Sequence, residues 1–164
     1  MLDSGGELRF LCDEMLRGLG RWLRAAGYDT VIAAGGLSDR ALAKLCASEQ
    51  RVLLTKDRRL AMTVEGAAPA MLVPGDGVDE AARALRIAFA IDWLHAPFTR
   101  CIVDNRPLET APSSSATMVP ERSPAAGGPL RVCLACGRLY WPGSHVCRMQ
   151  RRLVAWQREA GAPG

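Results

Sequence analysis

The sequence predicts an α/β protein with a three-layer parallel sheet, followed by a small C-terminal module. Short apolar runs alternate with amphipathic stretches from residue 8 to residue 91, and this alternation is typical of parallel strands joined by right-handed crossover helices. The pattern stops near Pro97, and four of the six cysteines lie beyond it. A length of 164 residues fits one ordinary domain with an appendage. We therefore expect a main domain over residues 1–97 and the module over residues 98–164.

Four strands are expected in the main domain, over residues 8–13, 28–33, 51–55 and 70–73. The first and third runs are mostly apolar and lead to Asp13 and Asp57, which favours strands buried on both faces of a sheet. Pro74 and Gly75 end the fourth strand, because both residues are poorly suited to the middle of a sheet.

Four helices are expected after these strands, over residues 15–26, 38–48, 58–64 and 79–91. Gly27 ends the first helix and Ser38 caps the start of the second. Apolar side chains recur at helical spacing and should face the core. They are Met15, Leu16, Leu19, Trp22, Leu23 and Ala26 in the first helix, Ala41, Leu42, Leu45 and Cys46 in the second, and Ala82, Leu85, Ala88 and Phe89 in the fourth.

Three aspartates are the strongest candidates for a catalytic site. Asp13 and Asp57 end the first and third strands, and Asp39 opens the second helix. Ligands collect outside the carboxyl ends of parallel strands, so these side chains should converge. Clustered carboxylates favour a hard divalent cation such as Mg²⁺ or Mn²⁺. Each aspartate taken singly also suits the start of a helix, where a carboxylate caps backbone N–H groups.

Four basic side chains are candidates for binding a phosphodiester substrate next to this metal. Lys56 and Arg58 flank Asp57, while Arg21 and Arg24 lie on the polar side of the first helix. Cations that meet phosphate beside metal-binding acids suit nuclease chemistry. A solvated helix face is the alternative interpretation of Arg21 and Arg24.

The net positive charge of the chain lies entirely in its last third. Residues 1–97 hold 12 basic and 13 acidic residues, whereas residues 98–164 hold 9 basic and 4 acidic residues. This asymmetry favours an anionic partner for the last third, and a solvated basic tail is the alternative.

Five segments of the main domain resemble the PIN-like Mut-seven C-terminal ribonuclease domain family: RFLCDEML at 9–16, RWLR at 21–24, AGYDT at 26–30, SD at 38–39 and RVLLTKDR at 51–58. The resemblance implies a PIN-like fold and metal-dependent cleavage of RNA, with Asp13, Asp39 and Asp57 at the acidic positions. A fourth acid is common in such sites. Asp76 is one candidate, and Gly75-Asp76-Gly77 equally fits a plain turn. Glu14 is expected to stand behind the metal-binding acids if it continues the strand, because neighbouring strand residues point apart.

The segment CLACGRLYWPGSH at 133–145 resembles the zinc-ribbon tail of the same family. Cys133 and Cys136 form one half of a metal knuckle. Cys101 begins the second half, but Asp104 stands where the family has cysteine. Three outcomes are open: Asp104 completes a Cys₃Asp zinc site, His145 or Cys147 supplies the fourth ligand, or the site is weakened. Cys12 and Cys46 are expected to be buried small hydrophobes.

The rest of the module is expected to contain a disordered insertion and a basic helix. Residues 110–129 are rich in Thr, Ala, Pro, Ser and Gly. Residues 147–159 should pack Met149, Leu153 and Trp156 inward, with arginines available to the RNA backbone. Tyr140 and Trp141 are expected to shield the metal knuckle, and stacking on RNA bases is the alternative.

These features together predict a metal-dependent ribonuclease. The alternatives are a non-catalytic RNA-binding protein or a protein-interaction module of the same fold. No apolar run approaches the roughly 20 residues that span a membrane. The N-terminus lacks the basic and apolar segments of a secretion signal, so we expect a cytoplasmic protein. The RNA substrate and the oligomeric state are not indicated by the sequence.

Overall fold

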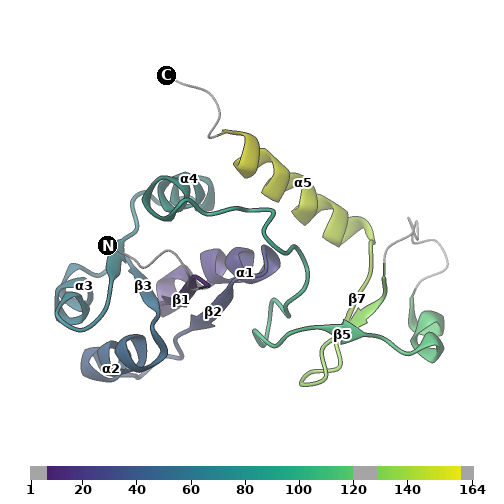
Figure 1. Ribbon diagram of the computed structural model, residues 1–164, viewed down its shortest axis with the longest axis horizontal. Helices are drawn as coiled ribbons and strands as arrows, with labels where there is room; N and C mark the ends of the chain where they lie inside the picture. Colours follow the sequence, from purple (N-terminus) through teal and green to yellow (C-terminus); the bar gives the residue numbers. More distant parts are fainter. Residues whose placement is uncertain (1–6, 120–128, 160–164) are drawn as a thin grey trace.

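The computed structural model describes residues 7–119 and 129–159. Its main sheet contains β1 (Arg9–Cys12), β2 (Asp29–Ile32), β3 (Val52–Thr55) and β4 (Ala70–Leu72). The strand order is β2-β1-β3-β4, and every neighbouring pair is parallel. Figure 1 shows this sheet with its helices. The predicted α/β fold class is therefore confirmed. No helix in the described ranges is long and apolar enough to cross a membrane.

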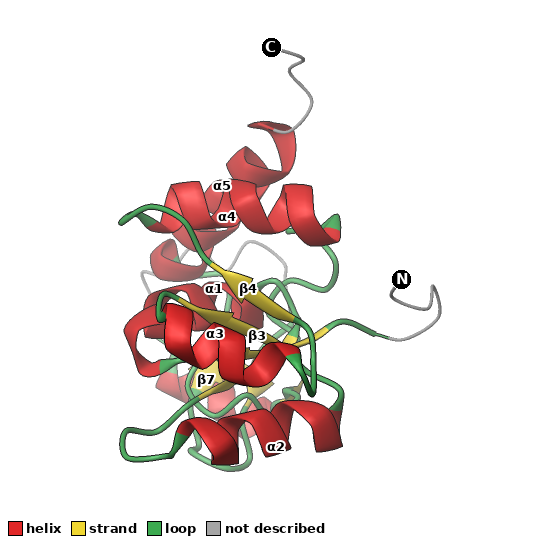
Figure 2. Cartoon of the chain, turned by 90° about the vertical axis from the view of Figure 1, so that its left-hand side faces the viewer, coloured by secondary structure: helices red, strands yellow, loops and turns green. Residues whose placement is uncertain are grey.

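Helices cover both faces of the sheet. One face packs against α1 (Arg17–Ala25) and α4 (Val78–Phe89), and the other against α2 (Asp39–Glu49) and α3 (Arg58–Glu65). Helix α5 (Ser144–Glu159) packs on α4 on the first side. Figure 2 shows α4 and α5 on one side of the sheet and α2 on the other. Alternation along β1 sends Phe10 into the first core and Leu11 into the second. This arrangement explains why the central strands are apolar on both sides.

Most predicted element bounds agree with the structure, but some predicted core residues are wrong. The first helical segment begins as a 3₁₀ turn, η1 (Glu14–Leu16), which turns Met15 outward so that 70% of it is exposed. Ala41 and Ala88 are also exposed, because they lie at the solvent edges of their helices. Gly27 follows α1 with φ +102°, and a Cβ there would lie 2.5 Å from the carbonyl oxygen of Ala96. Only glycine fits this position.

The module contains a second, antiparallel sheet of three short strands, β5 (Glu109–Thr110), β6 (Arg131–Val132) and β7 (Leu139–Tyr140). It is compatible with a zinc-ribbon-like module. The expectation of a disordered insertion over residues 110–129 is wrong for its first part. Ser113–Met118 form a 3₁₀ helix, η2, and the Ala111 N–H bonds to the carbonyl of Leu130 at 2.8 Å. Residues 120–128 of the expected insertion lie outside the described residues.

Helix α5 packs on the main domain, as its apolar stripe predicts. It begins at Ser144, three residues before the expected start, and buries Met149, Leu153 and Trp156. The Trp156 ring lies 4.9 Å, centroid to centroid, from the rings of both Trp22 and Trp93. Arg152 pairs with Asp79 at 2.9 Å on the exposed side of the helix, so an RNA phosphate would have to compete with that carboxylate.

Candidate active site and cysteine group

The three predicted aspartates line one pocket of about 170 Å³ at the carboxyl ends of β1 and β3. Glu14 lines the same pocket, beside exposed Met15 and Leu37. Within the described ranges, no lysine or arginine lines it. Repulsion among four carboxyl groups that line one pocket favours a cation there, but no three of these carboxyl groups place their oxygens within 4.8 Å of one another in this structure.

Asp13 is held in place by hydrogen bonds to both of its carboxylate oxygens. Its Oδ1 accepts from the N–H of Leu16 at 3.0 Å, which caps η1. Its Oδ2 accepts from the N–H of Lys56 at 3.2 Å and from the hydroxyl of Thr55. Only 7% of Asp13 is exposed. This aspartate is therefore both a helix cap and a wall of the pocket.

Asp57 also has both roles. Its Oδ1 accepts from the N–H groups of Arg59 at 2.7 Å and Leu60 at 3.3 Å, at the start of α3. Its own N–H donates to the hydroxyl of Thr55 at 2.9 Å. Asp39 differs, because Ser38 caps α2 by accepting from Ala41. Two of the three aspartates, Asp13 and Asp57, therefore cap helices and also line the pocket.

The structure changes the assignment of the fourth acid. Asp76 does not line the acidic pocket, and its carboxylate instead lies 3.3 Å from the Lys56 ammonium beside a separate pocket. Glu14 follows the end of β1, so the alternation of strand side chains no longer applies to it. Its Oε2 lies 2.8 Å from where a Cβ on Gly35 would stand. The expectation that Glu14 points away from the site is therefore wrong.

Among the predicted RNA-binding cations, Arg21 and Arg58 are exposed, and Lys56 pairs with Asp76. The prediction that Arg24 binds RNA, and the alternative that it lies on a solvated helix face, are both wrong, because Arg24 is buried. Its Nε donates to the carbonyl of Thr30 at 2.8 Å, and its Nη1 donates to those of Ile102 at 3.2 Å and Val103 at 2.6 Å. Burial lowers the pKa of Arg24. Its role here is to join α1 to the module.

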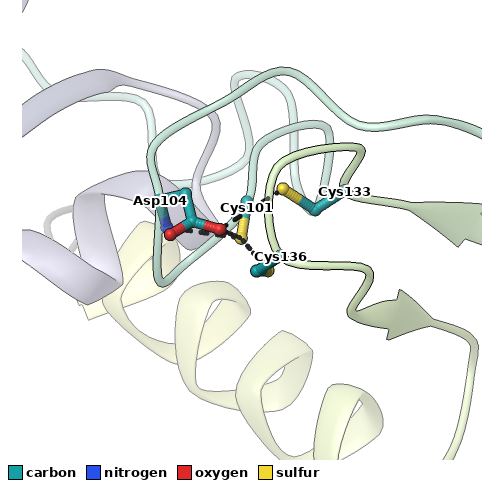
Figure 3. A group of neighbouring side chains, drawn as sticks. All are labelled: Cys101, Asp104, Cys133 and Cys136. Atoms are coloured by element: carbon teal, nitrogen blue, oxygen red, sulfur yellow. Dashed lines mark hydrogen bonds between the residues drawn. The ribbon is translucent and has the colours of Figure 1, made fainter.

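The second group consists of Cys101, Asp104, Cys133 and Cys136 (Figure 3). Their ligand atoms all lie within 4.8 Å of one another. Asp104 Oδ2 is 3.5 Å from the sulfur of Cys133 and 3.7 Å from that of Cys101. The sulfurs of Cys101 and Cys136 are 3.9 Å apart. Of the outcomes left open by the sequence, the structure gathers the Cys₃Asp set, while the Cys147 thiol instead lies 3.7 Å from the carbonyl oxygen of Pro142.

These distances fit a tetrahedral zinc ion. Bonds of about 2.3 Å to sulfur and about 2.0 Å to oxygen would separate sulfur pairs by about 3.8 Å and sulfur–oxygen pairs by about 3.5 Å. Tyr140 supports the group from behind. Its hydroxyl lies 3.1 Å from the Cys101 sulfur and accepts from the N–H of Ile102 at 3.1 Å. Burial raises the pKa of Tyr140, as does its hydrogen bond with Cys101. Tyr140 is thus buried against the cysteine group, and its shielding role stays a prediction.

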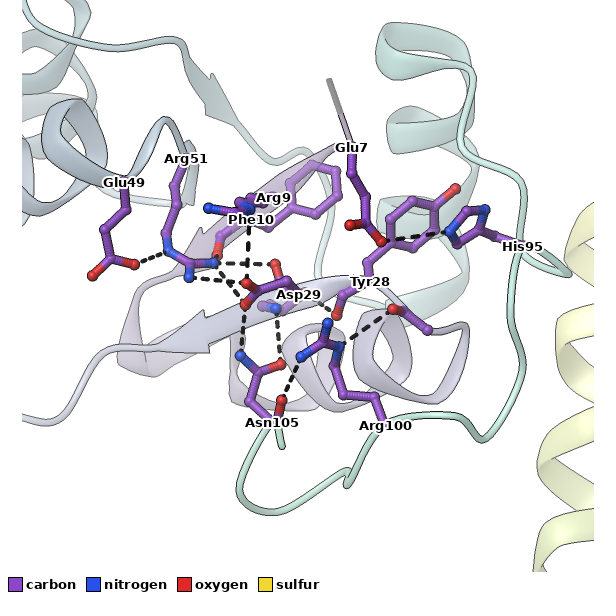
Figure 4. Close-up of polar contacts among 12 residues, drawn as sticks. Glu7, Arg9, Phe10, Tyr28, Asp29, Glu49, Arg51, His95, Arg100 and Asn105 are labelled. Atoms are coloured by element: carbon purple, nitrogen blue, oxygen red, sulfur yellow. Dashed lines mark hydrogen bonds and ion pairs between the residues drawn. The ribbon is translucent and has the colours of Figure 1, made fainter. Parts of the chain in front are cut away.

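A charged network that the sequence analysis missed joins the module to the amino end of the main sheet (Figure 4). Arg51 donates to both carboxylate oxygens of Asp29, at 2.9 and 3.2 Å. The side-chain amide of Asn105 donates to Asp29 at 2.7 Å. Burial alone would raise the pKa of Asp29, but these hydrogen bonds lower it below its usual value. The sequence signal for this network was a charged residue at or next to the start of three strands, namely Arg9, Asp29 and Arg51.

Cys12 and Cys46 are buried, as predicted. Burial raises the pKa of Cys46 to about 11 and also raises that of Cys12, so both remain thiols.

A family model described as the Mut7-C RNAse domain matches residues 8–153. This range includes the four carboxyl groups of the pocket and all four members of the cysteine group. The comparisons with curated proteins and with solved structures gave no match. Because the family model covers most of the 164 residues, the chain belongs to the Mut7-C RNAse domain family.

Proposed function

We propose that this protein is a metal-dependent ribonuclease that hydrolyses RNA phosphodiester bonds at the acidic pocket. The observation that carries the proposal is the convergence of Asp13, Glu14, Asp39 and Asp57 on one pocket that no basic residue of the described ranges lines. Carboxylate oxygens are the donors that Mg²⁺ and Mn²⁺ prefer. The family match supports RNA as the substrate.

The carboxylates are assigned different positions around the cation. The cap of α3 uses Oδ1 of Asp57, so we assign Oδ2 to the metal. Thr55 and the Lys56 N–H hold Asp13 so that its carboxylate keeps a fixed orientation. Asp39 and Glu14 approach from the exposed side of the pocket. When bound, Mg²⁺ or Mn²⁺ would activate a water and stabilise charge on the phosphate.

Exposed basic side chains are proposed to bind the RNA backbone near this pocket. Arg58 follows Asp57 directly, and Arg21 lies on the exposed face of α1. Lys56 is paired with exposed Asp76, so a phosphate must compete with that carboxylate. Such contacts predict RNA affinity that falls steeply with salt. Arg24 is omitted because it is buried.

The proposal is tested by RNA cleavage with and without added Mn²⁺. Asp13→Asn and Asp57→Asn keep a helix-capping side chain but lose a negative charge. Both should lower kcat by about 100-fold or more, in the range of losses for electrostatic stabilisation. Asp76→Asn, outside the pocket, is the matched control for kcat at saturating RNA, because it frees Lys56 and so changes only RNA affinity. Undiminished cleavage by both pocket variants contradicts the mechanism, and RNA that only shifts in mobility would favour the non-catalytic alternative.

We further propose that the cysteine group holds a structural zinc ion through Cys101, Asp104, Cys133 and Cys136. The buried core of the module is small, with Leu108 and Tyr140 as its large members, and such modules usually need a staple. A reducing compartment such as the cytoplasm suits these thiols. Metal analysis of the purified protein should find one zinc per chain and a loss of zinc in Cys133→Ser. Zinc-free wild-type protein would contradict this assignment.

A further inference from the structure

An apolar groove of about 520 Å³ lies between the module and the start of α5. Its apolar lining includes Phe98, Trp141, Pro142 and Val146, all of them half-buried. It shares no lining residue with the acidic pocket. The volume falls within the range typical of small-ligand sites, about 300–1,000 Å³. The ribonuclease mechanism proposed above gives this groove no role.

The charges around the groove are of one sign. Arg131 and Arg151 line it, and no acidic residue of the described ranges does so. An arginine beside an aromatic face is the combination that binds single-stranded nucleic acid, since the ring stacks on a base and the guanidinium meets phosphate. The excess of basic residues in the last third of the chain adds to this charge complementarity.

The backbone at Phe98 has an unusual conformation that places this residue in the groove. Its φ is +54°, in the left-handed region that bulky residues rarely adopt. Its N–H donates to the carbonyl of Ala25 at 2.8 Å, at the end of α1. Strained backbone of this kind is found preferentially at binding sites. The backbone conformation of Phe98 therefore supports a binding role for the groove that its ring lines.

The groove and the acidic pocket lie toward opposite ends of the main sheet. Helix α1 runs back from the end of β1 to the start of β2, so Ala25 and its partner Phe98 lie near the amino ends of the strands. Asp13 and Asp57 follow the carboxyl ends of β1 and β3. An RNA must therefore extend along the molecule to occupy both sites.

We propose that this groove binds an unpaired base and the adjacent phosphates of single-stranded RNA, at a distance from the site of cleavage. The proposal rests on the proposed function for the identity of the polymer. It makes the groove a second binding site that selects substrates long enough to reach it. A dinucleotide that fills only the acidic pocket should be insensitive to changes in the groove.

The test measures binding of a fluorescein-labelled oligouridylate of about 12 nucleotides, within the site sizes of single-strand-binding folds, to the full chain without added Mn²⁺. Trp141→Leu should raise the Kd by about 5- to 100-fold, the effect of losing one stacked base. Arg151→Gln should raise the Kd and reduce its dependence on salt concentration. Arg148→Gln is the matched control, because Arg148 is an exposed arginine of α5 that does not line the groove.

A second measurement identifies the site directly. RNA containing 4-thiouridine should crosslink on illumination to the peptides that carry Phe98 or Trp141. Cleavage of uridylyl-uridine should be the same in Trp141→Leu and wild type, which also shows that the variant is folded. Crosslinks confined to other peptides, or an unchanged Kd in both groove variants, would overturn the proposal and leave the groove as a site for a protein segment. Crosslinking at the groove in a protein that never cleaves RNA would contradict only the proposed function.

Discussion

The hydroxyl of Thr55 donates a hydrogen bond to Oδ2 of Asp13 while its oxygen accepts one from the N–H of Asp57 at 2.9 Å. Thr55 is the last residue of β3 and is fully buried. One hydroxyl therefore joins the two aspartates that follow neighbouring parallel strands. The geometry of the acidic pocket depends on this link as well as on the strand ends.

Thr55→Val should lower kcat, because it keeps the shape of the side chain and removes the hydroxyl. We expect a loss of about 10- to 100-fold, as for other residues that orient metal ligands, and a loss of about 1–2 kcal/mol in the free energy of unfolding. Thr55→Ser should restore most of the kcat. Steady-state RNA cleavage with Mn²⁺ and urea unfolding measure the two effects, and a valine variant with wild-type kcat would contradict the positioning role.

Glu14→Gln should reduce Mn²⁺ affinity, whereas Asp76→Asn should not. Glu14 lines the acidic pocket, but Asp76 pairs with Lys56 beside another pocket. Removing one carboxylate from a metal site typically weakens binding by about 10-fold or more. Titration of Mn²⁺ by electron paramagnetic resonance, which detects the free ion, gives both affinities. Equal affinities in the two variants would show that Glu14 is not a ligand.

Arg24→Gln should destabilise the protein, while Arg21→Gln should mainly weaken RNA binding. The buried Arg24 guanidinium satisfies the carbonyls of Thr30, Ile102 and Val103, and its loss should cost about 2–3 kcal/mol. Arg21 is exposed on the same helix, so its replacement should change stability by less than about 0.5 kcal/mol. Thermal unfolding and RNA titration separate the roles. An Arg24 variant of unchanged stability and reduced RNA affinity would restore the original sequence interpretation.

Asp29→Asn should destabilise the protein near neutral pH, with a smaller effect in acid. The hydrogen bonds from Arg51 and Asn105 lower the folded-state pKa of Asp29 below 3.8, so its ionised form stabilises the fold. That contribution is present above the unfolded-state pKa and is lost as the pH falls through the folded-state pKa. We expect a difference of about 1–3 kcal/mol at pH 7. Urea unfolding of both proteins from pH 7 to pH 3 measures it, and a pH-independent difference would contradict the ionic role.

The sequence was sufficient for the sheet and for three members of the acidic pocket. Strands 1 and 3 could be predicted because a run buried on both faces must be apolar, and the aspartates after them mark the sheet edge where sites form. Glu14 was misjudged because strand alternation was extended beyond Cys12, where the chain turns into η1. Residue type and spacing alone did not show where the strand ended.

The contacts between the main domain and the module could not be predicted in the same way. Arg24 shares the polar face of its helix with Arg17 and Arg21, so its spacing predicts exposure. It is buried because the loop of residues 102–103, nearly 80 residues later, packs against it. Asn105 and Asp29 meet for the same reason. Hydrophobic periodicity shows only which face of a helix is apolar, so it carries no information on a loop, distant in the sequence, that packs on the polar face.

The most direct test of a divalent metal held by the carboxylates is anomalous scattering from crystals soaked in Mn²⁺. We expect a peak in the acidic pocket at about 2.2 Å from oxygens of Asp13, Asp39 and Asp57, the distance of hard cations from carboxylates. We expect no such peak between Lys56 and Asp76. The absence of an anomalous peak in this pocket at saturating Mn²⁺ would contradict a metal held by these carboxylates.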